Sequence, residues 1–162
     1  MGISTIQNWL TLISEEVFDA AKGGYSAMGK FFQAVAEEIG MKRALELWGS
    51  SYEHYGPILD EMFRTQSLEE FGVNMGVMMI SLGLDSKISR TSNSVLATTR
   101  RCPEYDGYKE AGLDHEAIKK LCLCTVGSID ASLQKLGANG GMSINKYRSD
   151  SDDFCIEEFK KK

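Results

Sequence analysis

The sequence lacks any apolar run that could cross a membrane. Its longest candidate, residues 77–82, is far shorter than the roughly 20 apolar residues that a membrane helix needs. The stretch at residues 3–18 has no basic leader and is interrupted by amide and carboxylate side chains, so it lacks the pattern of a signal peptide. We therefore expect a soluble, cytoplasmic protein with no membrane partner.

A basic stripe is also missing. The formal net charge is −5, from 18 Lys and Arg against 23 Asp and Glu, and basic residues cluster only at 100–101 and 160–162. Because nucleic-acid binding needs clustered Lys and Arg to neutralise phosphates, we expect no nucleic-acid partner. The acidic run at 150–153 lacks the glycine and final glutamate of a twelve-residue calcium loop, so we expect it to form a solvated hairpin turn.

The sequence does contain enough apolar residues for a core. With 43% apolar residues in 162, it predicts a single domain over residues 1–162. Residues 1–83 are expected to form a helical layer, and residues 84–162 a cysteine-bearing α+β unit.

Apolar residues recur at the helical period throughout the first half. Two glycines at 23–24 are expected to end the first helix, and the pair Ser67 and Glu70 has the spacing of a capping box. The predicted helices span 5–21, 26–39, 41–54, 58–63 and 67–80.

The second half changes character after Gly83. The later part of residues 86–101 suits a strand, and Asp114 can cap a long helix over 115–136. A short helix is expected at 105–111, and alternating strands at 142–147 and 154–159. The resulting fold class is α+β, with a helical N-terminal half packed against a small antiparallel sheet and a long C-terminal helix.

The four cysteines all fall in this second half, on three expected elements. They are even in number without an export signal, which favours reduced thiols that bind metal or act in catalysis over disulfides. A CxxC motif is absent. If folding brings the thiols together, zinc or iron is the expected metal, and the candidate ligands are Cys102, Cys122, Cys124 and Cys155.

Two of these cysteines are separated by one residue on the long helix. Residues two apart on a helix point about 200° away from each other, so Cys122 and Cys124 do not easily share one metal ion. Cys122 lies beside the apolar stripe and suits the core, whereas Cys124 lies on a face of small residues. That face leaves two alternatives open, a ligand or a tightly packed helix.

Cys102 and Cys124 are the candidate catalytic nucleophiles. Thiolate chemistry needs a lowered pKa, and Arg100 and Arg101 could provide the charge that lowers it at Cys102. His54 and His115 are the candidate acid–base groups, although a single histidine beside a helix end is more often structural.

Four segments resemble the L-2-amino-thiazoline-4-carboxylic acid hydrolase-like family. They are GKFFQAVAEEIGMKRALELWGSSYEHYG, TTRRCPEYDGYKEAGL, LCLCTVGSID and YRSDSDDFCIEEF, and the likeness spans roughly residues 30–159. The resemblance implies that Cys102 and Cys155 match the first and last family cysteines, and that Cys122 or Cys124 matches the middle one. The sequence departs from the family pattern in two places. No acidic residue closely follows the middle cysteine, and an acidic run replaces the glycine of the last hairpin. A more distant likeness is to bacteriochlorophyll 4-vinyl reductase-like domains, which bind small ligands.

Three functions follow from these patterns. The first is a hydrolase that acts on a C–N or C–S bond of a small molecule in a cysteine-lined pocket. The second is a domain that binds a metal or a small ligand without catalysis. The third is an interaction protein, in which methionines form a homodimer face instead of ordinary core; the methionines concerned are Met28, Met62, Met75, Met78 and Met79.

Overall fold

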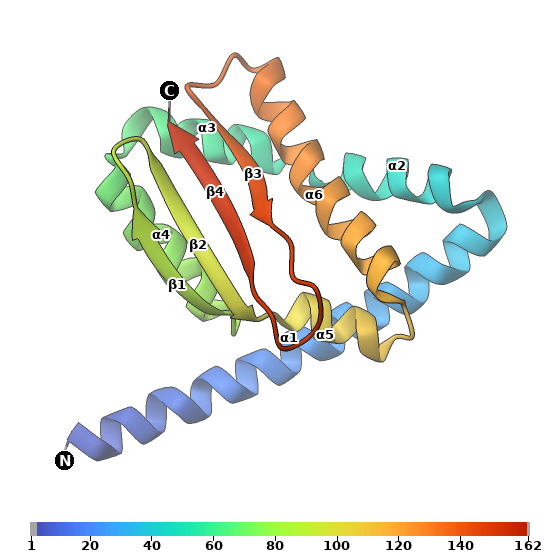
Figure 1. Ribbon diagram of the computed structural model, residues 1–162, viewed down its shortest axis with the longest axis horizontal. Coiled ribbons are helices and arrows are strands. Elements are labelled where there is room, and N and C mark those ends of the chain that lie inside the picture. Colours follow the sequence, from blue (N-terminus) through green and yellow to red (C-terminus); the bar gives the residue numbers. More distant parts are fainter. Residues whose placement is uncertain (1–2, 162) are drawn as a thin grey trace.

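The computed structural model, which describes the backbone of residues 3–161 and the side chains of residues 15–161, has the expected α+β fold (Figure 1). Its helices are α1 (Ile3–Ile39), α2 (Met41–Tyr52), α3 (Tyr55–Thr65), α4 (Leu68–Ser81), α5 (Pro103–Glu110) and α6 (His115–Lys135). Its strands are β1 (Asp85–Arg90), β2 (Ser94–Arg101), β3 (Gly140–Lys146) and β4 (Cys155–Lys161).

Within the described residues, the strands form one four-stranded antiparallel sheet in the order β1-β2-β4-β3. Helices cover one face of this sheet, the far face in Figure 1: α4 packs on β1 and β2, and α6 packs along β3. Because side chains alternate along a strand, each strand sends every second residue toward the helices. On β2 and β4 the inward pairs are Val95 with Phe159, Ala97 with Glu157, and Thr99 with Cys155.

The first helix does not end at the glycine pair, and the predicted break there is wrong. Residues 3–39 form one continuous helix through Gly23 and Gly24. A glycine weakens a helix by about 1 kcal/mol without forbidding it, and here the helix is held by α5. A Cβ built on Gly107 of α5 would lie 2.6 Å from the Lys22 carbonyl oxygen, so the two helices cross almost backbone to backbone.

The predictions based on local hydrogen bonding are confirmed. The amide of Glu70 donates to Ser67 Oγ at 3.2 Å, and the Glu70 carboxylate accepts from the Ser67 amide at 2.8 Å, which completes the capping box of α4. Asp114 caps α6 by accepting from the Ala117 amide at 2.8 Å. Proline does not interrupt α3, because Pro57 falls in its first turn, where no amide donor is needed.

The core consists of two groups of side chains. One lies between α3, α4, α6 and the sheet, and includes Phe63, Phe71 and Phe159. Met75 and Met79 belong to it, so these two methionines are core residues, whereas Met78 is 45% exposed. The other group joins α1, α2, α5 and α6, and contains Phe32, Ala44, Tyr105, Tyr108, Leu113, Ile118 and Leu121.

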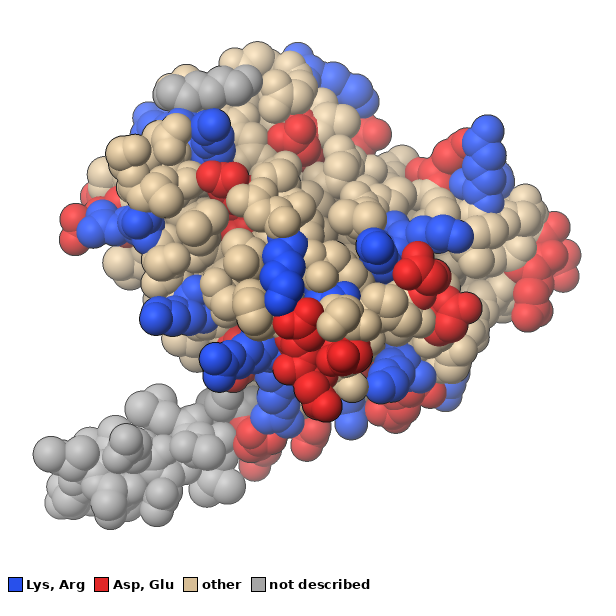
Figure 2. Space-filling view, in the orientation of Figure 1, with Lys and Arg blue, Asp and Glu red and all other residues tan. Residues whose placement is uncertain are grey.

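Acidic and basic side chains are interspersed on the face shown in Figure 2, and neither sign forms a continuous stripe there. Among the helices of residues 3–161, none is both long and apolar enough to pass through a bilayer.

Candidate functional site

Cys102, Cys122 and Cys155 come from three different elements, and two of them, Cys102 and Cys122, pack against the second core group. Cys102 is the residue before α5, Cys122 lies on α6, and Cys155 begins β4 on its inward side. The three are close enough for charge on Cys102 or on Cys155 to disfavour ionisation of Cys122. That these three thiols line one cavity stays a prediction.

Cys124 faces a different neighbour. Its thiol donates to the Leu45 carbonyl oxygen of α2 at 3.2 Å. A Cβ built on Gly49 of the same helix would lie only 2.9 Å from the Cys124 sulfur. Of the two alternatives for the small-residue face of α6, this geometry favours tight helix packing, and it gives no support to a catalytic role for Cys124.

The thiols are within electrostatic reach of each other, but not in the arrangement of a metal site. Among the described side chains, no three or more His, Cys, Asp or Glu residues are grouped so that they could hold a metal ion. The predicted zinc or iron site made of Cys102, Cys122, Cys124 and Cys155 therefore lacks geometric support.

Burial raises the pKa of the Cys102 thiol, and the nearby Glu104 raises it further, while Arg148 partly opposes the rise. Burial also raises the pKa of Cys122. The expectation that the adjacent arginines would lower the Cys102 pKa is wrong, because their side chains lie elsewhere. Arg101 donates to Glu15 at 2.8 Å and covers the ring of Phe18 at 3.7 Å, and Arg100 is exposed. The Cys102 thiol is thus neutral at pH 7.

Two glutamates that the sequence analysis missed lie beside these thiols. Glu104 is in the first turn of α5, and Glu157 points inward from β4, opposite Ala97. The pKa of each carboxyl is raised to about 7, by burial in Glu157 and by burial together with the charge of Glu157 in Glu104. One signal in the sequence could have identified Glu157. It lies two residues from both Cys155 and Phe159, so in a strand it points to the same face as they do. Nothing local distinguished Glu104 from any glutamate at a helix start.

Aromatic rings lie near the Glu104 carboxyl. Tyr108 is fully buried and contacts Tyr25 and Trp48, with ring centroids 5.7 and 6.0 Å apart. Tyr52 lies 5.5 Å from Trp48. The charge of Glu104 raises the pKa of Tyr25, Tyr52 and Tyr108, second only to burial, which places all three phenols around that carboxyl.

Several polar atoms in this region are buried without a hydrogen-bond partner among the described residues: Glu104 Oε1, Tyr108 OH, Tyr147 OH and Arg148 Nε. Tyr108 is near enough to Glu104 to oppose the rise in its pKa, and Tyr147 acts in the same way on Cys122. Neither contact has the distance and angle of a full hydrogen bond. Unpartnered buried polar atoms are costly, and they are typical of sites that bind a ligand.

We call this group the interior polar cluster. It consists of Tyr25, Tyr52, Cys102, Glu104, Tyr108, Cys122, Tyr147, Arg148, Cys155 and Glu157. Tyr108 and Arg148 are the most deeply buried of these residues, and the others have intermediate exposure.

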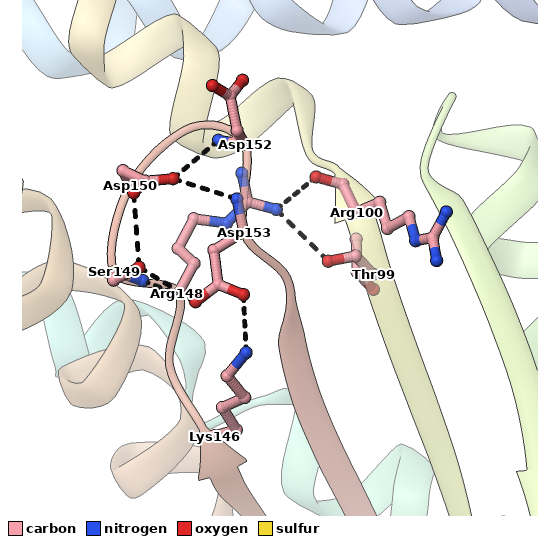
Figure 3. Close-up of polar contacts among 8 residues, drawn as sticks. All are labelled: Thr99, Arg100, Lys146, Arg148, Ser149, Asp150, Asp152 and Asp153. Atoms are coloured by element: carbon pink, nitrogen blue, oxygen red, sulfur yellow. Dashed lines mark hydrogen bonds and ion pairs between the residues drawn. The ribbon is translucent and has the colours of Figure 1, made fainter.

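Arg148 reaches from the β3–β4 connection to the end of β2 (Figure 3). Its guanidinium is 2% exposed, and it donates from Nη2 to the carbonyl oxygens of Thr99 at 3.2 Å and Arg100 at 2.5 Å. It also lies against the Cys155 thiol and stacks on the ring of Tyr105 at 4.7 Å. This buried cation has no ion pair with any described residue, and it links the β3–β4 connection to the end of β2.

The acidic run in that connection is structural, as expected. Asp153 pairs with Lys146 at 2.6 Å and accepts from the Ser149 amide at 3.0 Å. Asp150 accepts from the amides of Asp152 and Asp153 at 2.9 and 3.0 Å (Figure 3). The carboxylates thus fold the loop that carries Arg148.

His54 lies outside the interior polar cluster, whereas the His115 ring borders it, with its centroid 5.5 Å from that of the Tyr147 ring. His54 is exposed, with Nδ1 2.7 Å from the Ser51 carbonyl oxygen. His115 is half-buried at the start of α6, and its Nδ1 is hydrogen-bonded to the Tyr105 hydroxyl at 3.0 Å. These contacts favour structural roles for both.

No family model, curated protein or solved structure matches this chain.

Proposed function

We propose that this chain is a small-molecule hydrolase that binds its substrate in the interior polar cluster. The observation that carries the proposal is the buried pair Glu104 and Glu157, with the unpartnered Glu104 Oε1 and Tyr108 OH beside it. Perturbed carboxyls that face unsatisfied polar groups in a half-buried site are typical of acid–base chemistry. The resemblance to the aminothiazoline-carboxylate hydrolase-like family gives the expected substrate, a small compound with a C–N or C–S bond.

The carboxyl pair can supply both proton transfers of a hydrolysis. With pKa values of about 7, one carboxyl is ionised while the other keeps its proton at neutral pH. The ionised carboxylate takes a proton from water as the water oxygen bonds to the substrate carbon. The neutral carboxyl then protonates the leaving nitrogen or sulfur as the C–N or C–S bond breaks.

Cys102 has a conditional role in this scheme. Because burial raises its pKa, it becomes a nucleophile only if a neighbouring base removes its proton, and Glu104 is the nearest candidate by charge coupling. Otherwise the thiol contributes to the wall of the site.

A specific observation favours non-catalytic ligand binding as the second candidate. The pKa values of Cys102 and Cys122 are both raised by burial, which is the opposite of what a reactive thiolate needs. In this alternative the same cluster recognises a small ligand without turnover.

Turnover assays with matched variants test the proposal. Purified protein is incubated with L-2-amino-thiazoline-4-carboxylic acid and with a panel of small cyclic amidines and thioethers, and released thiol or amine is measured. The Glu157→Gln variant should lose roughly 100-fold or more of the rate, as expected for the loss of a general acid or base. Glu158→Gln is the control, because Glu158 is the next residue and points to the opposite face of β4. Equal rates for wild type and Glu157→Gln would exclude the acid–base role, and saturable binding without turnover would favour the second candidate.

A further inference from the structure

The acidic part of the interior polar cluster has no counter-ion among the described residues. Neither Glu104 nor Glu157 takes part in an ion pair there. Arg148 is the cluster's cation, but Nη2 of its guanidinium is bound to two backbone carbonyls, and its charge acts on Cys102 and Cys155. Two carboxyls from different elements therefore face the same interior with no positive group between them.

Aromatic rings pack against one another in the region near Glu104. Tyr108 is in edge contact with both Tyr25 and Trp48, and Tyr52 adds a fourth ring. Aromatic rings attract a cation over their faces, most strongly where water is excluded. Among the described residues, Glu104 Oε1 and the fully buried Tyr108 hydroxyl near it make no hydrogen bond of full distance and angle.

Ligands of other charge types fit this environment less well. An anion would approach two carboxyls in a region of low dielectric constant, where like charges repel strongly. A neutral ligand with few donors would leave the carboxyl oxygens unpartnered, which is costly in a buried site. A group that carries positive charge and several N–H donors would satisfy the carboxyl oxygens and contact the rings at once.

We infer that the interior polar cluster selects a small organic cation, a protonated amine or an amidinium, held between the Glu104 and Glu157 carboxyls and the rings of Tyr25, Tyr52 and Tyr108. This inference rests on the proposed function, because it assigns the charge of the ligand to the same site. It does not require that the ligand be turned over.

Isosteric probes separate charge from shape. Acetamidine and benzamidine are titrated into the full chain at pH 7.5 by calorimetry, beside their neutral isosteres acetamide and benzamide and the anions acetate and benzoate. Each amidine should bind at least about 10-fold more tightly than its amide, because only the amidine carries the charge and the additional N–H donors. Two probe sizes are used so that exclusion by size is not mistaken for rejection of the charge.

Variants test whether the amidines bind at the carboxyl pair. Glu157→Gln should weaken amidine binding about 10-fold and leave amide binding unchanged, because only the charge is removed. Glu158→Gln, on the opposite face of β4, should change neither. Glu104→Gln provides a second route if Glu157→Gln fails to fold, with the fold of each variant checked by circular dichroism.

The outcomes distinguish this inference from the proposed function. Amide or carboxylate binding that equals or exceeds amidine binding overturns the cation inference and leaves a small-molecule site in place. Amidine binding that Glu157→Gln and Glu104→Gln do not weaken also overturns it. Failure of both amidines to bind the wild type overturns it as well, whereas the hydrolase proposal stands or falls on turnover and its loss in Glu157→Gln.

Discussion

The carboxyls of Glu104 and Glu157 lower the stability of the folded protein when they ionise. An unfolded glutamate titrates near pH 4.3, whereas burial raises the folded pKa of each to about 7. A raised carboxyl pKa means that the folded state binds more protons than the unfolded state between these values. Stability is therefore greatest near or below pH 4 on this account, and it falls as pH rises through 7.

We accordingly predict that the free energy of unfolding decreases between pH 5 and pH 8, by about 3 kcal/mol for one such carboxyl. Urea denaturation at the two pH values measures it. Glu157→Gln should have a shallower pH dependence than the wild type and should be the more stable of the two at pH 8. An unchanged slope in the variant would show that Glu157 titrates normally in the folded protein.

At the scale of the elements, glycine has opposite consequences in two helices. Gly49 of α2 lies against α6, where an added Cβ would fall 2.9 Å from the Cys124 sulfur. Gly23 of α1 is exposed, and a Cβ there would meet no atom within 4 Å. The same substitution should therefore act in opposite directions at the two positions.

Gly49→Ala should destabilise the protein by about 1–3 kcal/mol because it overfills the α2–α6 contact. Gly23→Ala should stabilise it by up to about 1 kcal/mol because alanine favours a helix and nothing opposes it here. Thermal and urea denaturation of the pair measure both effects. A stabilising Gly49→Ala would mean that α2 and α6 are less tightly packed than this structure has them.

The sequence predicts an element well where its signal is local. The caps at Ser67 and Asp114 depend on side chains three residues from their partners, and both are confirmed. The continuity of α1 through residues 23–24 depends on contact with α5, about eighty residues away. The helix end predicted at these glycines is therefore wrong. Strand β1 was missed because its residues are mostly polar and exposed, and Ile88 is its inward apolar residue packed on the core.

The candidate site follows the same division. A grouping of Cys102, Cys122 and Cys155 was predicted from their places at a strand end, on a helix and on a strand, and it stays a prediction beyond their electrostatic influence on Cys122. The proximity of Glu104 to Glu157 could not be predicted, because it depends on how α5 docks against the sheet. Helical geometry correctly predicted that Cys124 points away from Cys122. It could not predict that α2 is the element that Cys124 contacts.

At the scale of the whole molecule, Arg148 joins parts of the chain that are about fifty residues apart. From the β3–β4 connection, its two hydrogen bonds reach the C-terminal end of β2. Its side chain also fills space beside Tyr105. Removing the side chain would leave two carbonyl oxygens without their donor and a cavity beneath the loop.

Arg148→Ala should therefore lower the free energy of unfolding by about 2–4 kcal/mol. Arg100→Ala is the control, because the Arg100 side chain is exposed and should change stability by less than about 0.5 kcal/mol. Denaturation of both variants at pH 7 measures the difference. Equal stabilities would mean that Arg148 contributes nothing net to the closure of the sheet end.

The order of the strands has a consequence for synthesis of the protein. Strand β4 comes last among the strands, yet it lies between β2 and β3 and supplies every pairing that β3 has within the described sheet. While a ribosome is still making residues 155–161, β2 and β3 each keep an unpaired edge. The glutamate that completes the carboxyl pair arrives on the same strand, so a nascent chain gains its four-stranded sheet and its carboxyl pair in one step.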